Sequence, residues 1–149
     1  MAVQGGEASR GRAPSLLLEI VTPEKRLVAE TVDEVVLPGT EGYLGVLPGH
    51  APLLTALGIG ELAFSRGGAR HYVSVAWGFA EVLPDRVNIL AEIAERAEEI
   101  DRERAARARD RAVGRLRGRD GETDFRRAQV ALEKSLIRIQ VAGHAGPDR

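Results

Sequence analysis

The sequence has no cysteine, few aromatic residues and no long apolar run. Its 149 residues include no Cys, and Phe, Trp and Tyr together make up only 4%. The lack of Cys excludes disulfides, thiolate metal sites and thiol catalysis, and the scarcity of aromatic residues predicts a mostly aliphatic core. No apolar run approaches the roughly 18 residues of a membrane-spanning helix, and the first residues have no apolar stretch typical of a secretory signal.

The usual constellations of catalytic or metal-binding residues are also missing. The histidines are scattered, with no spacing typical of metal ligands: His50, His71 and His144. There is no G-x-S-x-G nucleophile motif and no G-x-x-x-x-G-K-[ST] phosphate loop. We therefore predict no catalysis by the chain alone, no catalytic residue, no metal site and no required cofactor.

Charge divides the chain into two parts. Residues 15–99 carry 13 acidic and 6 basic side chains, a net charge of 6 − 13 = −7, whereas residues 100–142 carry 12 basic and 7 acidic ones, a net charge of 12 − 7 = +5. The whole chain has a net charge of −1, which hides this difference. The asymmetry predicts two structural units with different partners.

Residues 15–93 consist of short apolar, β-rich runs separated by turns, which is typical of an antiparallel β-sandwich. Hairpin turns are predicted at residues 66–68 and 84–86, where Gly or Pro-Asp interrupts the runs. Residues 1–14 are rich in Gly, Arg, Ala and Ser without periodicity, and we interpret them as a flexible tail.

The pattern becomes helical over residues 94–142, which predicts a two-helix antiparallel hairpin and an α+β fold class. The first helix, 94–117, consists largely of Ala, Arg and Glu. Breaks follow at residues 118–121, and Thr123 or Asp124 is suited to cap a second helix that ends at Gly143. Residues 143–149 are predicted to be a second flexible tail.

Helical periodicity predicts one thin apolar seam between the two helices. On the first helix the predicted seam comprises Ala105, Ala108, Ala112 and Leu116, and on the second it comprises Phe125, Ala128, Leu132, Leu136 and Ile139. Because such a seam buries little apolar area, we expect the hairpin to open easily.

Three motifs resemble the epsilon subunit of bacterial F-type ATP synthase. They are LPGTEGYLGVLPGHAPLLTAL at residues 37–57, GFAEVLPDRVNILAE at 78–92 and DFRRAQVALEKSLIRI at 124–139. The resemblance implies a β-sandwich followed by a helical hairpin, as the pattern itself predicts. It also implies a non-catalytic central-stalk subunit of a proton-driven rotary motor, peripheral on the cytoplasmic side of the cell membrane.

Partners and contact residues follow from the same resemblance. The sandwich would bind the gamma subunit and the c-ring, coupling rotation to ATP synthesis. The loop around Glu41, Gly42, Tyr43 and Leu44 would face the c-ring, and His50 would lie near gamma. Many relatives have an acidic residue where this chain has Tyr43. His50 between Gly49 and Ala51 has the alternative role of fixing a turn.

The hairpin would act as the regulator in this family, permissive when folded on the sandwich and inhibiting ATP hydrolysis when extended. Its basic side chains would then face an acidic loop of the catalytic beta subunits, next to alpha. The candidate contacts are Arg126, Arg127, Lys134 and Arg138. The alternative is that these side chains form a solvated helix face.

Some members of the family bind ATP on the hairpin through a motif of Ile or Leu, Asp, two variable residues, Arg and Ala. The run IDRERA matches it at Ile100, Asp101, Arg104 and Ala105. Further candidate binding residues are Glu95, Arg111, Lys134 and Arg138, with Lys134 where binders tend to carry Arg. A six-residue motif also arises easily in an Ala/Arg-rich helix, so ATP as a regulatory ligand is a hypothesis.

One alternative comes from a different class: a nucleic-acid-binding adaptor that uses the basic hairpin on phosphates. Acidic residues alternate with Arg in the hairpin and no aromatic residue lies among the basic ones, so we expect no nucleic-acid partner. A third candidate, a small hydrolase, lacks any credible pair of nucleophile and base.

Overall fold

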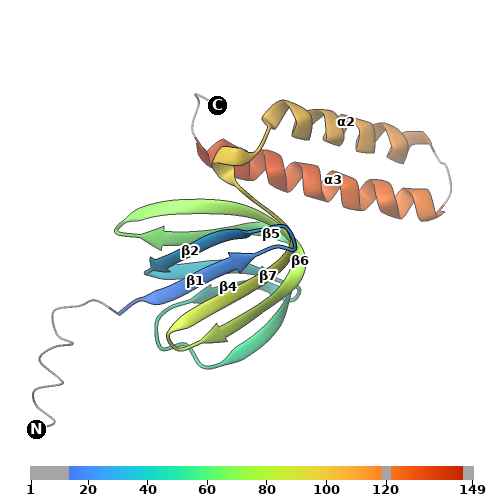
Figure 1. Cartoon of the computed structure of the whole chain (residues 1–149). Coiled ribbons are helices and arrows are strands. Elements are labelled where there is room, and N and C mark those ends of the chain that lie inside the picture. The colour runs from blue at the N-terminus through green and yellow to red at the C-terminus, as the bar shows by residue number, and fades with distance from the viewer. Residues whose placement is uncertain (1–13, 119–121, 146–149) are drawn as a thin grey trace, which may run out of the picture.

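A wrapped β-sheet carries a pair of helices on one of its faces (Figure 1). The computed structural model describes residues 14–118 and 122–145. The strands are β1 (Leu16–Val21), β2 (Arg26–Val32), β3 (Glu34–Gly39), β4 (Gly42–Val46), β5 (Leu53–Arg66), β6 (Ala69–Leu83) and β7 (Arg86–Arg96). The helical elements are η1 (Ala97–Glu99), α2 (Arg102–Gly118), α3 (Glu122–Ala142) and η2 (Gly143–Ala145).

The seven strands form one sheet in the order β2-β1-β7-β6-β5-β3-β4, which wraps into the predicted sandwich. All neighbouring strands pair antiparallel except β1 and β7, which run parallel from Leu17↔Arg86 to Val21↔Leu90. Parallel pairing needs a long connection, and β1 and β7 are joined by the whole of the sandwich. Both predicted hairpin turns are confirmed, at the β5–β6 and β6–β7 connections.

The sandwich interior is aliphatic, as the composition predicts. Side chains from all seven strands close one core, with Phe64 as its single aromatic member. Alternate residues of β1, Leu16, Leu18 and Ile20, are completely buried. Burying one such side chain contributes about 1.5–3 kcal/mol, so the stability of the fold resides mainly in this core.

The alternation of β6 inverts at Trp77 and Gly78. Before this site the odd-numbered residues Val73 and Val75 point into the core, and after it the even-numbered residues Ala80 and Val82 do so. Trp77 has a φ of 60° and Gly78 a φ of 129°. A Cβ on Gly78 would also collide with the Leu90 carbonyl oxygen. Only glycine fits there, because both the backbone angle and the neighbouring strand exclude a side chain.

The boundary between sheet and hairpin lies later than predicted. Strand β7 continues to Arg96 instead of ending at residue 93, and α2 begins only at Arg102 instead of residue 94. Residues 94–96 have helix-forming side chains, but Val73 pairs with Arg96 and Val75 with Ala94 across the sheet. Cross-strand pairing therefore overrides the local helix propensity.

The second helix ends where the sequence predicts, but it begins earlier than predicted. It begins at Glu122, before both candidate caps, and ends at Ala142, followed by η2. Residues 143–145 of the predicted C-terminal tail are thus a 3-10 turn. The rest of that tail, and the predicted N-terminal tail apart from Pro14, lie outside the described residues.

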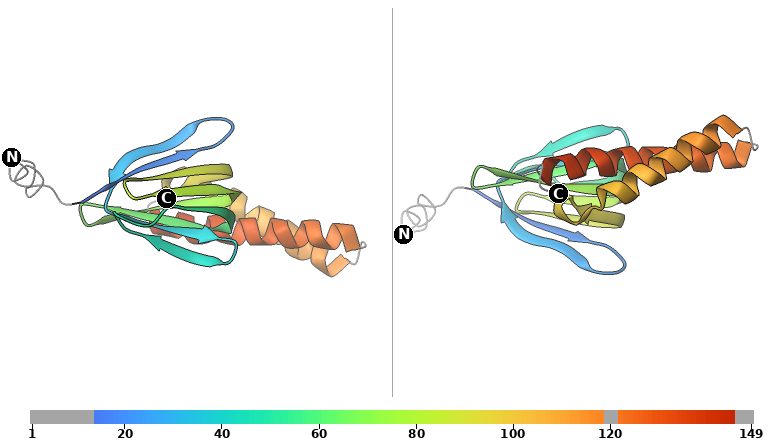
Figure 2. Two further views of the ribbon diagram at one scale, coloured as in Figure 1. Left: turned by 90° about the horizontal axis from the view of Figure 1, so that it is seen from below. Right: turned by 90° about the horizontal axis from the view of Figure 1, so that it is seen from above.

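Helix α3 lies on β5 and β6, and α2 packs on α3 (Figure 1). Figure 2 shows that the end of the hairpin where α2 passes to α3 extends beyond the sandwich. The root of the hairpin is held by a small apolar cluster. Its members are Tyr72, Ala97, Ile100, Ile137, Val141, Ala142 and Ala145.

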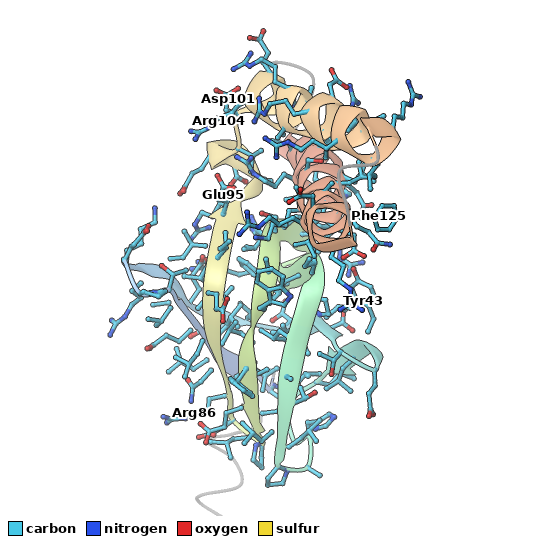
Figure 3. The ribbon with its side chains drawn as sticks, turned by 90° about the vertical axis from the view of Figure 1, so that its right-hand side faces the viewer. Tyr43, Arg86, Glu95, Asp101, Arg104 and Phe125 are labelled. Atoms are coloured by element: carbon cyan, nitrogen blue, oxygen red, sulfur yellow. The ribbon has the colours of Figure 1, made fainter. Side chains whose placement is uncertain are left out.

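The predicted seam is correct at three of its four alanines and wrong at two large residues, and the fourth alanine, Ala108, is half-buried. Ala105, Ala112 and Ala128 are completely or almost completely buried. Phe125 and Leu136 instead remain 50% and 47% exposed, and Figure 3 shows Phe125 pointing away from the sheet. Because α3 must also face the sheet, it is rotated so that the large residues at the edge of the stripe are left in solvent.

Candidate functional site

A cleft of about 410 Å³ lies between the outer face of the sheet and the hairpin. We call it the hairpin cleft. Its lining residues are Ile59, Ser74, Val75, Ala76, Ile93 and Glu95 from the sheet, Arg104 and Ala108 from α2, and Ala131, Lys134, Ser135, Ile137 and Arg138 from α3. This volume falls in the range of small-molecule sites, and the apolar lining with a few polar groups is also typical of them.

Three cations and one carboxylate set the charge of the hairpin cleft. Arg138 Nε lies 2.7 Å from Glu95 Oε1, and a second guanidinium nitrogen lies 3.3 Å from Glu95 Oε2. Lys134 Nζ lies 4.3 Å from the centre of the Trp77 ring, a cation–π contact that leaves its charge unneutralised. With Arg104 included, the formal charge is +3 − 1 = +2, so the cleft favours an anionic ligand.

The run Ile100–Ala105 is used largely by the fold itself. Ile100 is buried in the apolar cluster at the hairpin root. The Asp101 side chain caps α2, because its Oδ1 accepts a hydrogen bond of 3.0 Å from the Arg104 backbone N–H. Ala105 is completely buried. Of the four motif residues, only Arg104 lines the hairpin cleft.

The other predicted ATP-binding residues divide in the same way. Glu95, Lys134 and Arg138 line the hairpin cleft with Arg104, and the four side chains come from β7, α3 and α2. Arg111 is exposed on α2 and does not line it. Figure 3 shows Glu95, Asp101 and Arg104 together at the root of the hairpin.

The predicted contacts to beta are also split by the folded hairpin. Arg126 and Arg127 are exposed on the first turns of α3. Lys134 and Arg138 are held on the sheet by Trp77 and Glu95. In this arrangement, therefore, the four cations do not form one accessible face.

The predicted gamma and c-ring residues lie in two places. Gly42, Tyr43 and Leu44 begin β4, just after Glu41 in the turn from β3. Tyr43 is 61% exposed, but its hydroxyl accepts a 3.1 Å hydrogen bond from the Glu61 backbone N–H.

His50 lies in the loop between β4 and β5. Its Nδ1 lies 2.7 Å from the Ala51 carbonyl oxygen, and the neighbouring Gly49 N–H donates to the Pro84 carbonyl. These local bonds fit the turn-fixing role of His50 that the sequence left open.

Sequence reasoning missed an exposed apolar surface beside the hairpin. Leu54, Phe79 and Leu90 are 71%, 56% and 60% exposed, and Phe79 pairs with Leu90 across β6 and β7. We call these three residues the bare patch. The inversion at Trp77 and Gly78 places the bare patch on the same sheet face that the hairpin covers at residues 74–76 of β6. The adjacent apolar pairs at 79–80 and 89–90, which interrupt the alternation of apolar and polar residues, were the available signal.

The described residues contain no cluster of acidic or histidine side chains able to hold a metal ion. Among those same residues, no helix is long and apolar enough to cross a membrane. Neither observation identifies the ligand of the hairpin cleft.

Comparison with known proteins decides the family. A model for the β-sandwich domain of the ATP synthase delta/epsilon chain matches residues 15–97, and one for the long α-helix domain of that chain matches residues 98–143. The chain belongs to this family. The match over both units favours this family over the nucleic-acid-binding adaptor considered from the sequence.

Relatives in bacteria cover almost the same length. The ATP synthase epsilon chain of Citrifermentans bemidjiense is 50% identical over 134 residues, which are 89% of this chain and 97% of the relative. That of Nitratidesulfovibrio vulgaris is 52% identical over 131 residues, 88% of this chain and 98% of the relative. The resemblance seen in the sequence is therefore confirmed, as is the prediction of a non-catalytic subunit of the ATP synthase complex.

Solved structures agree. A chain of the Euglena gracilis mitochondrial ATP synthase, in a cryo-EM structure of OSCP, F1 and c-ring, has a TM-score of 0.76 and 27% identity. The match covers 89% of this chain and 83% of that one. A chain of the Tetrahymena thermophila central stalk and c-ring shares the fold, with a TM-score of 0.52 and 14% identity over 87% and 95% of the two chains. The chain is thus part of an ATP synthase complex.

Proposed function

We propose that the chain is the central-stalk subunit that couples c-ring rotation to ATP synthesis in a proton-driven synthase, on the cytoplasmic side of the cell membrane. The observation that carries the proposal is the division of one sheet face between the docked hairpin and the bare patch. Exposed contiguous apolar side chains mark interaction surfaces. The bare patch would bind gamma, with His50 at the same end of the sandwich.

The contact with the c-ring would use the β3–β4 turn at Glu41 and Gly42, followed by Tyr43 and Leu44. Because the Tyr43 hydroxyl is occupied by the Glu61 backbone, Tyr43 would offer its ring to the neighbouring subunit. Aromatic rings of this kind are enriched at protein interfaces. The acidic residue of many relatives would offer a charge at the same position.

The hairpin would inhibit ATP hydrolysis when it leaves the sandwich. Docking occupies Lys134 and Arg138 with Trp77 and Glu95. Undocking would release both cations, and together with Arg126 and Arg127 they would attract an acidic loop of the beta subunits, next to alpha. The conformational change itself would thus create the interacting surface.

The hairpin cleft would bind ATP as a regulatory ligand. Arg104, Lys134 and Arg138 supply positive charge for phosphates, and the two arginines offer bidentate donors. Arg138 would exchange its contact with Glu95 for the ligand. Since the cleft exists only between hairpin and sheet, its ligand would stabilise the docked arrangement.

Titration calorimetry of ATP into the full chain tests the ligand. Arg104→Gln and Arg138→Gln should each weaken binding at least about tenfold, because a charge-assisted hydrogen bond is lost. The matched control is Arg107→Gln, one turn further on α2, where the side chain is 61% exposed and pairs with Glu103. No heat from the parent chain, or equal affinities in all variants, would reject the site.

Removal of the hairpin tests the regulation. A chain truncated after Glu99, assembled into the complex, should raise ATP hydrolysis while leaving assembly with gamma and the c-ring intact. Leu90→Glu in the bare patch should instead impair assembly with gamma. Unchanged hydrolysis after truncation would argue against an inhibitory hairpin, and normal assembly of Leu90→Glu would argue against the bare patch as the gamma surface.

A further inference from the structure

The C-terminal end of the hairpin is fastened to the sheet by a contact outside the hairpin cleft. The His144 ring stacks on the Tyr72 ring, with 3.6 Å between the centroids and 9° between the planes. His144 Nε2 lies 2.8 Å from Glu61 Oε1, and Gln140 Nε2 donates to the same oxygen over 3.2 Å. We call these four residues the C-terminal latch. It joins η2 and the last turn of α3 to β5 and β6.

The C-terminal latch lies at the root of the hairpin, where it can control the release of α3 from the sheet. The chain enters the hairpin through η1, and the apolar cluster of Ile100, Val141 and Ala142 lies beside the latch. Arg102 reinforces the same end, since a guanidinium N–H donates to the Ala142 carbonyl over 2.6 Å. The other end of the hairpin extends beyond the sandwich (Figure 2). For α3 to leave the sheet completely, the contacts of His144 have to break.

We infer that the C-terminal latch is a pH-responsive fastener, which tightens hairpin docking when His144 is protonated. A neutral imidazole can donate only one ordinary hydrogen bond to the Glu61 carboxylate, whereas an imidazolium makes a charge-assisted one, which is about twice as strong. A positively charged ring over the face of Tyr72 adds a cation–π attraction. Imidazoles in general change charge between pH 5 and 8.

The groups around His144 support this direction of the response. Glu61 comes from β5, Tyr72 from β6 and Gln140 from α3, so the only ionised group that bonds to the ring in the described chain is an acid. The acidic side chains of the neighbouring η1, Glu98 and Glu99, are exposed, and Glu99 pairs with Lys25 over 3.3 Å.

On the hairpin side, the cation Arg102 contacts the Ala142 carbonyl. Docking therefore strengthens as the pH falls from 8 to 6.

Hydrogen exchange of the full chain measures this directly. The amides of α3 exchange when the hairpin opens, and parent and variant chains compared at the same pH share the same intrinsic rates. At pH 6, α3 amides of the parent should exchange about threefold to tenfold more slowly than those of His144→Gln, which keeps a donor but cannot be charged. At pH 8 the two proteins should differ by less than about twofold.

Matched variants separate the latch from other titrations. In Glu61→Gln, the α3 exchange rate relative to that of His144→Gln should be the same at pH 6 and at pH 8. His71→Gln should keep the difference between the two pH values, because His71, the residue before Tyr72 on β6, stacks on the core side chain of Phe64 with 5.2 Å between the ring centroids. Equal protection of the parent and His144→Gln at both pH values would overturn the inference, as would a pH response that survives in Glu61→Gln.

A second measurement guards against variants that fold poorly. In the parent chain at pH 6, the ring protons of His144 should be shifted upfield by the stacked Tyr72 ring, and Tyr72→Leu should remove that shift. A parent spectrum with no such shift would also reject the latch. Its regulatory meaning rests on the proposed inhibitory hairpin, but these measurements on the chain alone test docking, and the ATP hydrolysis of the truncated complex tests inhibition.

Discussion

The interior of the sandwich and the docking of the hairpin are stabilised by different kinds of contact. Inside the sandwich, large aliphatic side chains such as Leu18, Ile20 and Ile89 are completely buried. Between hairpin and sheet, a small apolar cluster around Tyr72 is joined by an ion pair, a cation–π contact and a ring stack with hydrogen bonds. Between the helices, the buried residues are mostly alanines.

This difference indicates which part of the chain can move without unfolding. Apolar burial contributes about 25 cal/mol per Å², so alanine seams contribute little, whereas the sandwich core contributes most of the stability. Partly exposed polar contacts contribute only about 1 kcal/mol each, and ligands, pH or a partner can replace them. The hairpin is therefore suited to detach from a sandwich that stays folded.

The largest effect is expected from truncating a core leucine. Leu18→Ala should lower the free energy of unfolding by about 2–5 kcal/mol, because it leaves a cavity in a close-packed interior. Leu136→Ala in α3, where the side chain is 47% exposed, should cost less than about 1 kcal/mol. Urea unfolding followed by circular dichroism measures both, and equal losses would contradict the contrast between the two regions.

Two glycines provide the next comparison. Gly78→Ala should destabilise the sandwich by more than about 2 kcal/mol, because the methyl group meets the Leu90 backbone at a positive φ. Gly114→Ala should stabilise α2 by up to about 1 kcal/mol, since a Cβ added at this position would have no neighbour within 4 Å. Thermal unfolding of both variants tests this, and a neutral Gly78→Ala would contradict the described strand inversion.

The ion pair across the hairpin cleft should have a moderate effect. Glu95→Gln, Arg138→Gln and the double variant form a double-mutant cycle, for which we expect a coupling energy of about 1 kcal/mol. Both side chains are less than one third exposed, 30% and 23%, so solvent screening is incomplete. Hydrogen exchange of α3 provides the readout, and additive effects of the two changes would show that the pair does not fasten the hairpin.

A smaller effect is expected from the cation over Trp77. Lys134→Gln should weaken docking by about 0.5–1 kcal/mol through the lost cation–π contact. Trp77 is the only tryptophan of the chain, so its fluorescence spectrum should change in the same variant. Glu133→Gln, in which an exposed neighbour loses its charge, is the matched control and should leave the emission unchanged.

The smallest effect concerns acid sensitivity within the sandwich. Partial burial by itself would raise the pKa of Glu30, but hydrogen bonds from Arg66 and Arg96 outweigh burial and lower this pKa below its ordinary value. Glu30 therefore contributes stability above the ordinary glutamate range, and that contribution is lost as the pH falls through the lowered pKa.

A Glu30→Gln variant tests this acid sensitivity. Because Arg66 is 60% exposed, screening limits the effect to about 0.5 kcal/mol. The variant should lose less stability than the parent between pH 5 and pH 3 in urea unfolding, opposite in sign to the latch between pH 8 and pH 6. An equal acid loss in both proteins would show that Glu30 does not carry it.

Local patterns were sufficient for the β-rich runs, the turns at 66–68 and 84–86 and the end of α3 at Ala142, because turn residues and periodicity are short-range signals. They failed at residues 94–96, which have helix formers but pair with β6. They also failed at Leu136, whose exposure depends on how α3 is rotated toward the sheet.

By itself, the sequence determined the class of the fold, the aliphatic core, the two units and the family resemblance, since these follow from composition, spacing and motifs along the chain. Only the tertiary structure decided that Arg138 meets Glu95 and that His144 lies on Glu61. Those contacts join residues 43 and 83 positions apart, and packing between separate elements alone fixes such distances.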